Sequence, residues 1–288
     1  MAVSSRSGII ILFATITACT LILFPILQIV VERDPQLSAY DDDWNDISKF
    51  REALENEPDT SYNVSAILSN PAVLDEVSNP SSTLLVIAGT ESPYTRLELE
   101  ILVSFMEKGG SILVFGDFDY SNTIADLFAI EYVKHKLWDR NYRGNVSLIE
   151  TTAFVDGQSY NVLLNEPVAI KALDSQELNL WSSGFEWSRN VFMTTSSNSW
   201  IDSDDDGAIT PEDEVAPLSG FTLGMSCGMK SKGEPLGSAV FISDSSLPIN
   251  NMWSEGQNSE FLLALVDSMI GDGGVILFDE SRHTQESF

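Results

Sequence analysis

Two short apolar runs constrain the fold of this chain more than any other feature. Residues 84–88 read LLVIA, residues 112–115 read ILVF, and a glycine directly follows each run. Runs of this length that are apolar at every position are typical of strands buried on both faces, as in a parallel sheet covered by two layers. The two runs therefore predict neighbouring strands at the centre of the fold.

The segment between these runs predicts a helix. Thr95 and Glu98 have the spacing of a capping box, in which two side chains satisfy backbone N–H groups at the start of a helix. Beyond Glu98, polar and apolar residues recur at helical spacing. A strand, a helix and a strand in this order form a βαβ unit, which indicates an α/β fold.

Other parts of the chain predict more elements of the same kind. Helices are expected at residues 47–54, 122–130 and 259–270, and a short helix or turn is expected at 71–77. Strands are expected at residues 63–68, 162–164, 168–170, 191–193, 239–242 and 275–278. A hairpin-like segment is expected at 218–230 and a loop at 137–147. Together these elements predict a mostly parallel sheet with helices on both faces.

The N-terminal region carries a membrane signal. Residues 8–31 contain no charged side chain and are rich in Ile, Leu and Phe, and a run of about 20 such residues can span a bilayer. Arg6 precedes the run, and acidic residues predominate after it, which indicates an uncleaved anchor with its N-terminus inside. Residues 16–19 (ITAC) resemble a lipoprotein cleavage motif. Lipidation is the less favoured alternative, because the apolar run continues past Cys19.

These signals predict the organisation of the whole chain. Residues 1–7 would be a cytoplasmic N-terminus, 8–31 a transmembrane anchor, 32–39 a tether and 40–288 an exterior α/β domain. We therefore expect a single-pass protein of the cell membrane, with the membrane and an envelope protein as partners. The sequence leaves open whether the acceptor sequons at Asn63 and Asn145 are glycosylated.

Charge and cysteine content exclude two classes of protein. The chain has 43 acidic and 15 basic residues among 288, a formal net charge of −28. Such a chain offers no basic surface for nucleic acid, because the phosphate backbone requires Lys and Arg. Its two cysteines, one of them inside the apolar N-terminal run, rule out a disulfide framework.

Residues 202–213, with the sequence DSDDDGAITPED, match the 12-residue calcium loop. Alternate acidic side chains can surround one ion, and the glycine at position 6 permits the sharp turn. The predicted Ca²⁺ ligands are Asp202, Asp204, Asp206 and Asp213, the Ala208 carbonyl, and Thr210 directly or through water.

The match has two departures. Position 12 is Asp213 where a bidentate Glu is usual, although dockerin-like modules also use Asp there, and no convincing helix precedes Asp202. The alternative is an acidic surface loop that matches by chance. We expect a structural Ca²⁺ that pins the long loop between two strands.

The order of several segments identifies a family resemblance. The segments are YDDDWND (residues 40–46), the βαβ stretch at 83–118, VLLNEP (162–167), AVFISDSSLPINN (239–251) and FLLALVDSMIGDGGVILFDESRH (261–283). This order resembles the family called domain of unknown function 4350 over residues 40–283. That family is similar to class I glutamine amidotransferase-like folds, which have a flavodoxin-like parallel sheet. The resemblance implies no catalytic residues, since the family has no established activity.

An amidotransferase requires a nucleophilic Cys on a sharp turn between a strand and a helix, with a His nearby. The turn after residues 112–115 reads GDFD and has no Cys, and Cys227 falls in the hairpin-like segment. We therefore expect no glutaminase activity.

Ligands of open α/β sheets bind beyond the carboxyl ends of the strands. The polar candidates there are Glu91, Asp117, Asp119, Asp244, Asp279, Arg282 and His283. The simpler reading is that such turns favour Asp and Ser for local hydrogen bonds. The leading functional hypothesis is a non-catalytic module at the cell envelope that binds a ligand or protein. The alternative is a hydrolase that acts through the strand-end carboxylates or a metal.

Overall fold

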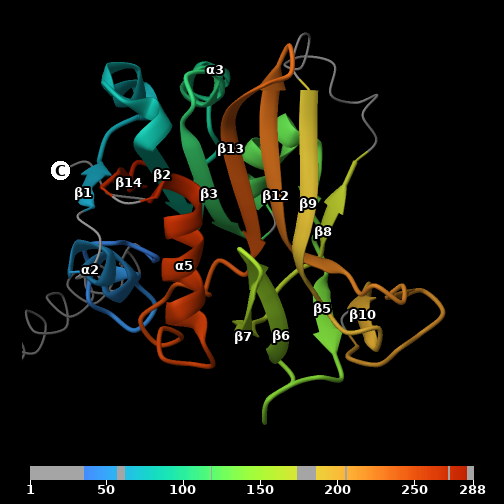
Figure 1. Cartoon of the computed structure of the whole chain (residues 1–288). Coiled ribbons are helices and arrows are strands. Elements are labelled where there is room, and N and C mark those ends of the chain that lie inside the picture. The colour runs from blue at the N-terminus through green and yellow to red at the C-terminus, as the bar shows by residue number, and fades with distance from the viewer. Residues whose placement is uncertain are drawn as a thin grey trace, which may run out of the picture. The chain divides into compact units, whose positions relative to one another are not determined.

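The computed structural model of the chain describes residues 36–56, 62–117, 119–173, 186–204, 206–271 and 273–283 (Figure 1). The anchor predicted at residues 8–31 lies outside the described residues. Among those that are described, no helix is long and apolar enough to cross a membrane. The predictions of an N-terminal transmembrane helix in the fold and of a single-pass membrane location are therefore corrected and not retained.

One large mixed sheet organises the described residues. Its strands follow the order β1-β14-β2-β3-β13-β12-β9-β6-β7, with β4 and β8 beside this path. The first five strands of the order are parallel to one another. They are β1 (Asn63–Ile67), β14 (Val275–Asp279), β2 (Thr83–Ala88), β3 (Ser111–Gly116) and β13 (Glu234–Ser243).

The remaining strands pair antiparallel. They are β12 (Thr222–Ser231), β9 (Glu186–Thr194), β6 (Leu148–Val155), β7 (Gln158–Asn165), β4 (Ile130–Tyr132) and β8 (Ile170–Ala172). A separate three-stranded sheet contains β5 (Lys136–Asp139), β10 (Ser199–Asp202) and β11 (Glu214–Val215).

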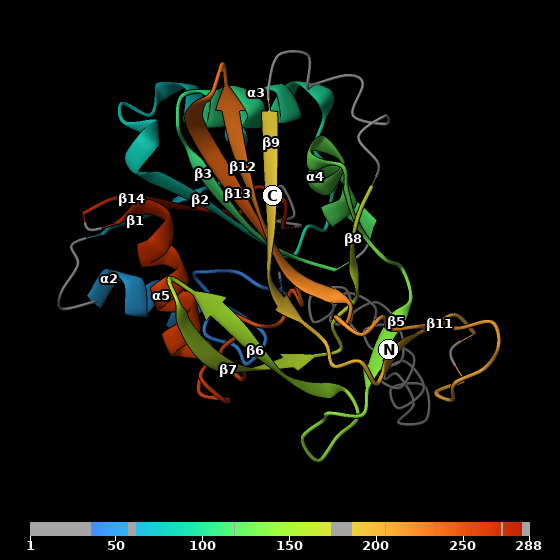
Figure 2. The ribbon, with the colours of Figure 1, turned by 45° about the vertical axis from the view of Figure 1, so that its right-hand side comes forward.

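This architecture corrects the predicted fold class. The sheet is mixed and not the mostly parallel, class I glutamine amidotransferase-like sheet that the sequence predicted. The parallel half ends where β13 pairs with β12, which returns antiparallel along it (Figure 2). Lys232 and Gly233 form the connecting turn, both with positive φ, as two-residue hairpin turns require. The segment predicted as a hairpin at 218–230 is thus largely one strand, which pairs with β13 on one side and β9 on the other.

Helices cover both faces of the parallel half. On one face lies α3 (Arg96–Glu107), where Leu102, Phe105 and Met106 pack against side chains of β2, β3 and β13. The capping box predicted at its start is confirmed, because Thr95 N–H donates to Glu98 Oε2 at 2.7 Å and Glu98 N–H donates to Thr95 Oγ1 at 3.4 Å. The short helix α4 (Asn122–Ala125) also contributes to this side of the core.

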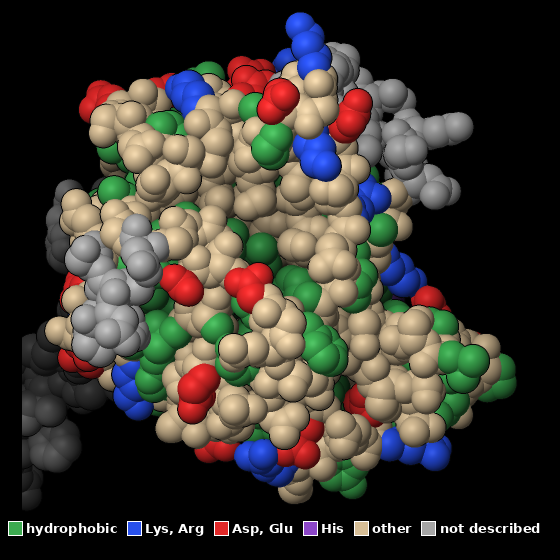
Figure 3. All heavy atoms as spheres, viewed as in Figure 1, with side chains coloured by type: hydrophobic (Ala, Val, Ile, Leu, Met, Phe, Trp, Pro, Cys, Tyr) green, Lys and Arg blue, Asp and Glu red, His purple; other side chains and the backbone are tan. Residues whose placement is uncertain are grey.

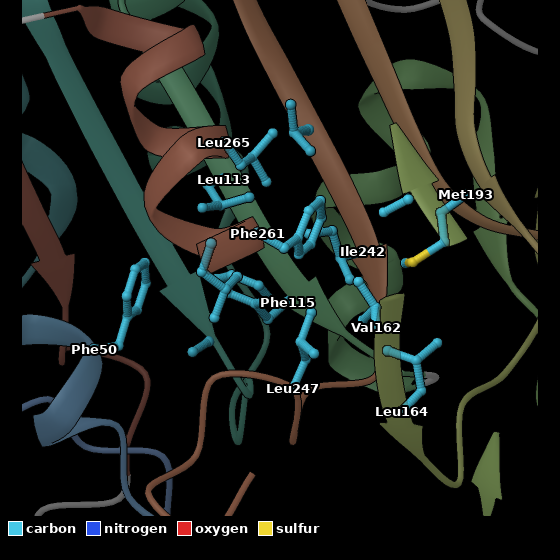
Figure 4. Close-up of a cluster of buried hydrophobic side chains, with 14 of the residues drawn as sticks. Phe50, Leu113, Phe115, Val162, Leu164, Met193, Ile242, Leu247, Phe261 and Leu265 are labelled. Carbon is cyan, nitrogen blue, oxygen red and sulfur yellow. The ribbon is translucent and has the colours of Figure 1, made fainter. Parts of the chain in front are cut away.

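The other face is covered by α2 (Ser48–Asn56) and α5 (Asn258–Ile270). Figure 4 shows Phe50 of α2 and Phe261 of α5 in one cluster with Phe115 of β3. Val162 of β7 and Met193 of β9 belong to the same cluster, so the parallel and antiparallel halves share a continuous core.

Four short 3₁₀ helices connect these elements. They span Pro71–Glu76, Pro80–Ser82, Asp119–Ser121 and Asp126–Phe128. The third of these begins three residues after the last residue of β3 and brings Ser121 back over the end of that strand.

Candidate functional site

A pocket of about 240 Å³ lies at the carboxyl ends of β2 and β3, where the sequence predicted a ligand site. We call it the strand-end pocket. The parallel register places Ala88 beside Phe115 and Gly116 beside Ser243, so the residues that follow β2, β3 and β13 come together. Its polar lining residues are Gln36, Thr90, Glu91, Asp117, Tyr120, Ser121 and Ser245.

Glycines allow the chain to close around this pocket. A Cβ on Gly116 would lie 2.7 Å from Cβ and Oγ of Ser121, so the 3₁₀ helix approaches the strand only because that residue is glycine. Gly89 has a φ of 56°, and a Cβ there would collide with the side chain of Leu37, which also lines the pocket. Both glycines therefore set the wall of the pocket.

Asp117 and Asp244 form a pair of neighbouring carboxyl groups, which we call the strand-end pair. The hydroxyl of Ser245 donates to Asp117 Oδ2 at 2.6 Å, and its N–H donates to Oδ1 at 3.3 Å. Asp244 accepts the N–H of Asn165 at 2.5 Å, the N–H of Ser246 at 2.8 Å and the Ser246 hydroxyl. Each carboxylate is thus held by backbone and serine donors.

Burial determines the acidity of the strand-end pair. Asp244 is 1% exposed, and burial, followed by the negative charge of Asp117, raises its pKa to about 8 despite the hydrogen bonds from Ser246 and Asn165. Burial also raises the pKa of Asp117, while the hydrogen bonds from Ser245 oppose the change. Desolvation disfavours the charged form of both groups.

The backbone of Asp244 has a φ of 108°, a conformation that non-glycine residues rarely adopt. The surrounding bonds hold it there, since Asp244 N–H donates to Gly116 O at 3.3 Å and its side chain bonds the segment at Asn165. The strained turn thus follows β13, whereas the sequence directed attention to the turn after β3.

The C-terminal candidates are engaged in scaffold contacts. Asp279 accepts the hydroxyl of Tyr94 at 2.5 Å and the N–H of Ser281 at 2.9 Å. Arg282 pairs with Glu98 at 2.5 Å, and its guanidinium lies 4.7 Å from the centroid of the Tyr94 ring. These contacts fasten the segment after β14 to the start of α3, and neither residue lines the strand-end pocket.

His283 is buried and uses both ring nitrogens. Nε2 lies 2.9 Å from Ala88 O and Nδ1 lies 3.1 Å from Glu280 Oε2. Because a carbonyl and a carboxylate only accept, both nitrogens donate, which requires the protonated ring. Burial alone lowers the pKa of His283, but the bonds to Glu280 and Ala88 and the charge of Glu280 outweigh it, so the pKa is raised.

The seven site residues predicted from the sequence therefore fall into those near the strand-end pocket and those that make other contacts. Glu91 and Asp117 line the pocket, and Asp244 lies behind it. The side chain of Asp119 lies outside what the structure describes. Sequence reasoning did not single out Ser121 or Tyr120, which reach the pocket through the 3₁₀ helix, and no motif marks them.

The calcium loop predicted at residues 202–213 connects β10 to β11. Carboxylate oxygens of Asp202, Asp204 and Asp206, which we call the loop triad, all lie within 4.8 Å of one another. Oxygens that share one Ca²⁺ at 2.3–2.6 Å lie no more than about 5 Å apart, so this spacing fits the ion. Gly207 has a φ of 74°, as the predicted sharp turn requires.

The other predicted ligands are tied to the loop itself. Asp213 accepts the N–H of Ser203 at 2.8 Å and, through its other oxygen, the N–H and hydroxyl of Thr210 at 2.7 and 3.1 Å. Backbone hydrogen bonds from Thr210 and Ser203 lower the pKa of Asp213. The N–H of Ala208 donates to Asp206 at 2.7 Å. Asp213 therefore closes the loop and stands apart from the loop triad.

Two further features bear on chemistry. Cys227 lies on β12 and is 1% exposed, and burial raises the pKa of its thiol to about 12, so it is not a nucleophile at neutral pH. A separate hollow of about 390 Å³ lies between α5 and strands β9 and β12 on the face shown in Figure 3.

The family described as Domain of unknown function (DUF4350) matches residues 39–266 of this chain. No curated protein gives a significant match. One similar solved structure is the "mmIFT52 N-terminal domain", with 12% identity, a TM-score of 0.45, and coverage of 71% of this chain and 82% of that one.

Two enzymes show weaker similarity. The exo-beta-1,4-mannosidase Op5Man5 from Opitutaceae bacterium strain TAV5 has 14% identity and a TM-score of 0.29, with 67% of this chain and 25% of that one covered. A beta-galactosidase from Rahnella sp. R3 has 13% identity and a TM-score of 0.32, with 64% and 22% covered. This chain thus spans a quarter or less of either enzyme. All three TM-scores are below 0.5, so these similarities carry no argument about function.

Proposed function

The chain belongs to the DUF4350 family, whose function is unknown, and we propose that it is a non-catalytic domain that binds a small polar ligand in the strand-end pocket. The observation that carries the proposal is the convergence of Thr90, Asp117 and Ser245 on one pocket from three different strand ends. Convergent polar groups in a concave site are the usual basis of small-ligand recognition.

The pocket suits a small ligand. Its volume of about 240 Å³ lies just under the range of about 300–1,000 Å³ typical of drug-sized ligands. Ser245 holds the carboxylate of Asp117 in place through two hydrogen bonds, so the group is oriented before a ligand arrives. A pre-oriented group loses little conformational freedom on binding, which favours affinity.

Non-catalytic binding is favoured because the reactive groups nearby are already occupied. The ring nitrogens of His283 both bond within the protein, Arg282 is paired with Glu98, and the Cys227 thiol is buried. A general acid or base must come within hydrogen-bonding reach of its substrate. None of these three residues lines the strand-end pocket.

A hydrolase acting through the strand-end pair is the second candidate. Neighbouring carboxyl groups with raised pKa values are candidates for general acid and base catalysis, and the strained backbone of Asp244 adds to this case. Against it, Asp244 is 1% exposed and does not line the pocket, so a substrate would reach Asp117 alone.

We also propose a structural Ca²⁺ at the loop triad. The donors are hard carboxylate oxygens, which Ca²⁺ prefers, and their spacing fits one ion. The N–H groups of Asp206 and Gly207 donate to Asp202 at 3.3 and 2.9 Å, so this buried ligand is fixed by the loop backbone. When bound, the ion would neutralise the repulsion among the three carboxylates and hold the β10–β11 connection.

A fragment screen against the full chain by ligand-observed NMR tests the binding proposal. Thr90→Phe should fill the strand-end pocket and abolish binding of the hits. The matched control is Ser188→Phe, which places the same side chain in the hollow of Figure 3 and should leave binding intact. Hits that survive Thr90→Phe but are lost in Ser188→Phe would move the ligand site to that hollow and contradict the proposal.

Turnover separates the two candidate functions. A broad hydrolase screen should show no activity that depends on Asp117. Activity that Asp117→Ala abolishes, in a variant with an unchanged unfolding temperature, would replace the binding proposal with the hydrolase.

A further inference from the structure

We propose that the strand-end pocket receives an organic cation with a primary ammonium group. This inference rests on the proposed function and specifies the chemical class of its ligand. The ammonium group would sit against the carboxylate of Asp117 and the hydroxyl of Thr90, with Ser121 and Ser245 beside it.

The side chains of the pocket are almost entirely hydrogen-bond acceptors or hydroxyls. Glu91 and Asp117 supply carboxylates, and Gln36 is the one lining side chain that contains nitrogen. Among the described residues, the lining includes no Lys or Arg. A site of this composition complements a ligand that donates hydrogen bonds and carries positive charge, and it disfavours phosphates and carboxylates.

Thr90 supplies an independent observation. Its hydroxyl oxygen is buried and has no hydrogen-bond partner within the described part of the chain. Buried polar atoms in native proteins nearly always have a partner, and each exception requires an explanation. An N–H group of a ligand would provide that partner after a rotation of the Thr90 side chain toward the pocket, because its oxygen is closed to solvent in the ligand-free conformation.

Asp117 has acceptor capacity left over. Ser245 donates one hydrogen bond to each carboxylate oxygen. The backbone of Asp244 contributes a third hydrogen bond. An ionised carboxylate offers about four acceptor positions, so about one remains for a ligand. Burial raises the pKa of Asp117, and an ammonium group beside it would favour the charged form again.

The buried His283 makes its direct contacts outside the strand-end pocket. The charge of Glu91 contributes to the raised pKa of His283, so these two groups interact. The ring of His283, however, bonds directly to Glu280, whose pKa is lowered by this contact despite its burial. The positive charge of His283 is therefore shared with Glu280, and no hydrogen bond or ion pair within the described residues joins it to Asp117.

Two sources can supply the same ammonium chemistry in a space of about 240 Å³. One is a free alkyl diamine, and the other is a lysine side chain presented by a partner protein. The probes below separate them.

Isothermal titration of the full chain with 1,4-diaminobutane, and with 1,4-butanediol as its neutral isostere, tests the inference. Titrations at about 0.15 M salt screen the long-range attraction of a protein with net charge −28. We expect the diamine to bind at least about tenfold more tightly than the diol, a difference of about 1.4 kcal/mol. A peptide with one lysine, beside its Nε-acetylated form, reports whether a lysine side chain enters.

The variants locate the binding. Asp117→Asn preserves the shape and should weaken diamine binding at least about tenfold. Thr90→Val removes only the unpartnered hydroxyl and should weaken it by a smaller factor. Glu107→Gln removes one exposed carboxylate of α3 and should leave affinity unchanged. The thermal unfolding temperature of each variant verifies that it is folded.

The outcomes distinguish this inference from the proposed function. The proposal of a cationic ligand would be rejected if the diamine and the diol bound equally well. It would also be rejected if Asp117→Asn and Glu107→Gln lost the same amount of affinity for the diamine. If fragment hits occupy the pocket but neither ammonium probe binds, the proposal of a cationic ligand is rejected and the proposed binding function is retained. If neither the ammonium probes nor the fragments bind, both the cationic ligand and the proposed binding function are rejected. Binding of the lysine peptide without the diamine supports the cation and assigns it to a partner protein.

Discussion

The strand-end pair and the loop triad both bring aspartates together, but in opposite surroundings. Asp244 is buried, and its pKa is raised to about 8. In the loop triad, Asp204 and Asp206 are exposed, and only Asp202 is buried, with backbone N–H groups on both of its oxygens. The strand-end pair includes a fully buried carboxyl group, whereas the loop triad lies largely at the surface.

The difference shows how burial directs the chemistry of one residue type. A carboxylate taken out of water without a cation holds its proton, because desolvation penalises the charge. Carboxylates in water stay charged and repel each other, which makes them a cation site. Glu280 is an intermediate case, since it is buried beside the protonated ring of His283 and its pKa is lowered.

The largest expected effect separates the two clusters by stability. Asp244→Ala leaves the N–H groups of Asn165 and Ser246 without their acceptor and puts alanine at a φ of 108°. We expect a loss of about 3 kcal/mol in the free energy of unfolding, measured in urea. Asp206→Ala in the presence of EDTA should change it by less than about 0.5 kcal/mol. Similar losses in both variants would contradict the comparison.

Calcium should act on the loop triad alone. At 100 times Kd, an ion that binds the folded state adds about 2.7 kcal/mol to its stability. The Asp202→Ala, Asp206→Ala double variant should lose this gain, whereas Asp117→Asn should keep it. Fluorescence of Trp138 is a second readout, because its ring lies beside Gly207 of the calcium loop, 3.7 Å from where a Cβ of that residue would be. A calcium response that persists in the double variant would reject the site.

The protonated ring of His283 should stabilise the folded protein most at low pH. The raised pKa of His283 means that its contribution to stability is fully present below about 6.5 and is lost as pH rises through the folded-state pKa. His283→Gln should therefore cost about 1.5 kcal/mol at pH 6, the lower range for hydrogen bonds to charged groups, and less at pH 9. Urea unfolding at the two pH values measures this, and an equal cost at both would show that the ring is bound neutral.

The smallest expected effect is a pH slope. The unfolded chain releases the Asp244 proton near pH 3.8, whereas the folded protein keeps it until about pH 8. The stabilisation by this proton is fully present below 3.8 and is lost as pH rises to about 8. Relative to Asp244→Asn, wild type should therefore lose up to about 1.4 kcal/mol for each pH unit between pH 5 and pH 8. Parallel profiles would place the titration elsewhere.

Local patterns predicted the elements that depend on neighbouring residues. The apolar runs of β2 and β3 and the capping box of α3 were correct, because burial on both faces and helix capping are written within a few residues. The region read as a loop at 137–147 instead begins with the end of β5, and β6 follows it. In β6, buried residues alternate with half-buried or exposed ones, and polar residues interrupt the apolar ones, so no continuous apolar run marked it.

The site followed the same division. The gathering of the loop triad was predictable, since alternate aspartates and a glycine act within one loop. The contacts of Asp279, Arg282 and His283 with the region of Ala88 to Glu98 were not predictable, because that region is far away in the sequence.

By itself, the sequence determined the central strands, the helix between them, the spacing of the loop triad and the position of polar residues after strands. Only the tertiary structure decided that β12 returns antiparallel along β13, which makes the sheet mixed, and which strand-end residues remain open to a ligand. The physical reason is the distance along the sequence over which each interaction acts. Burial patterns and turns act over a few residues, whereas strand direction and hydrogen-bond saturation depend on segments that meet only after the chain has folded.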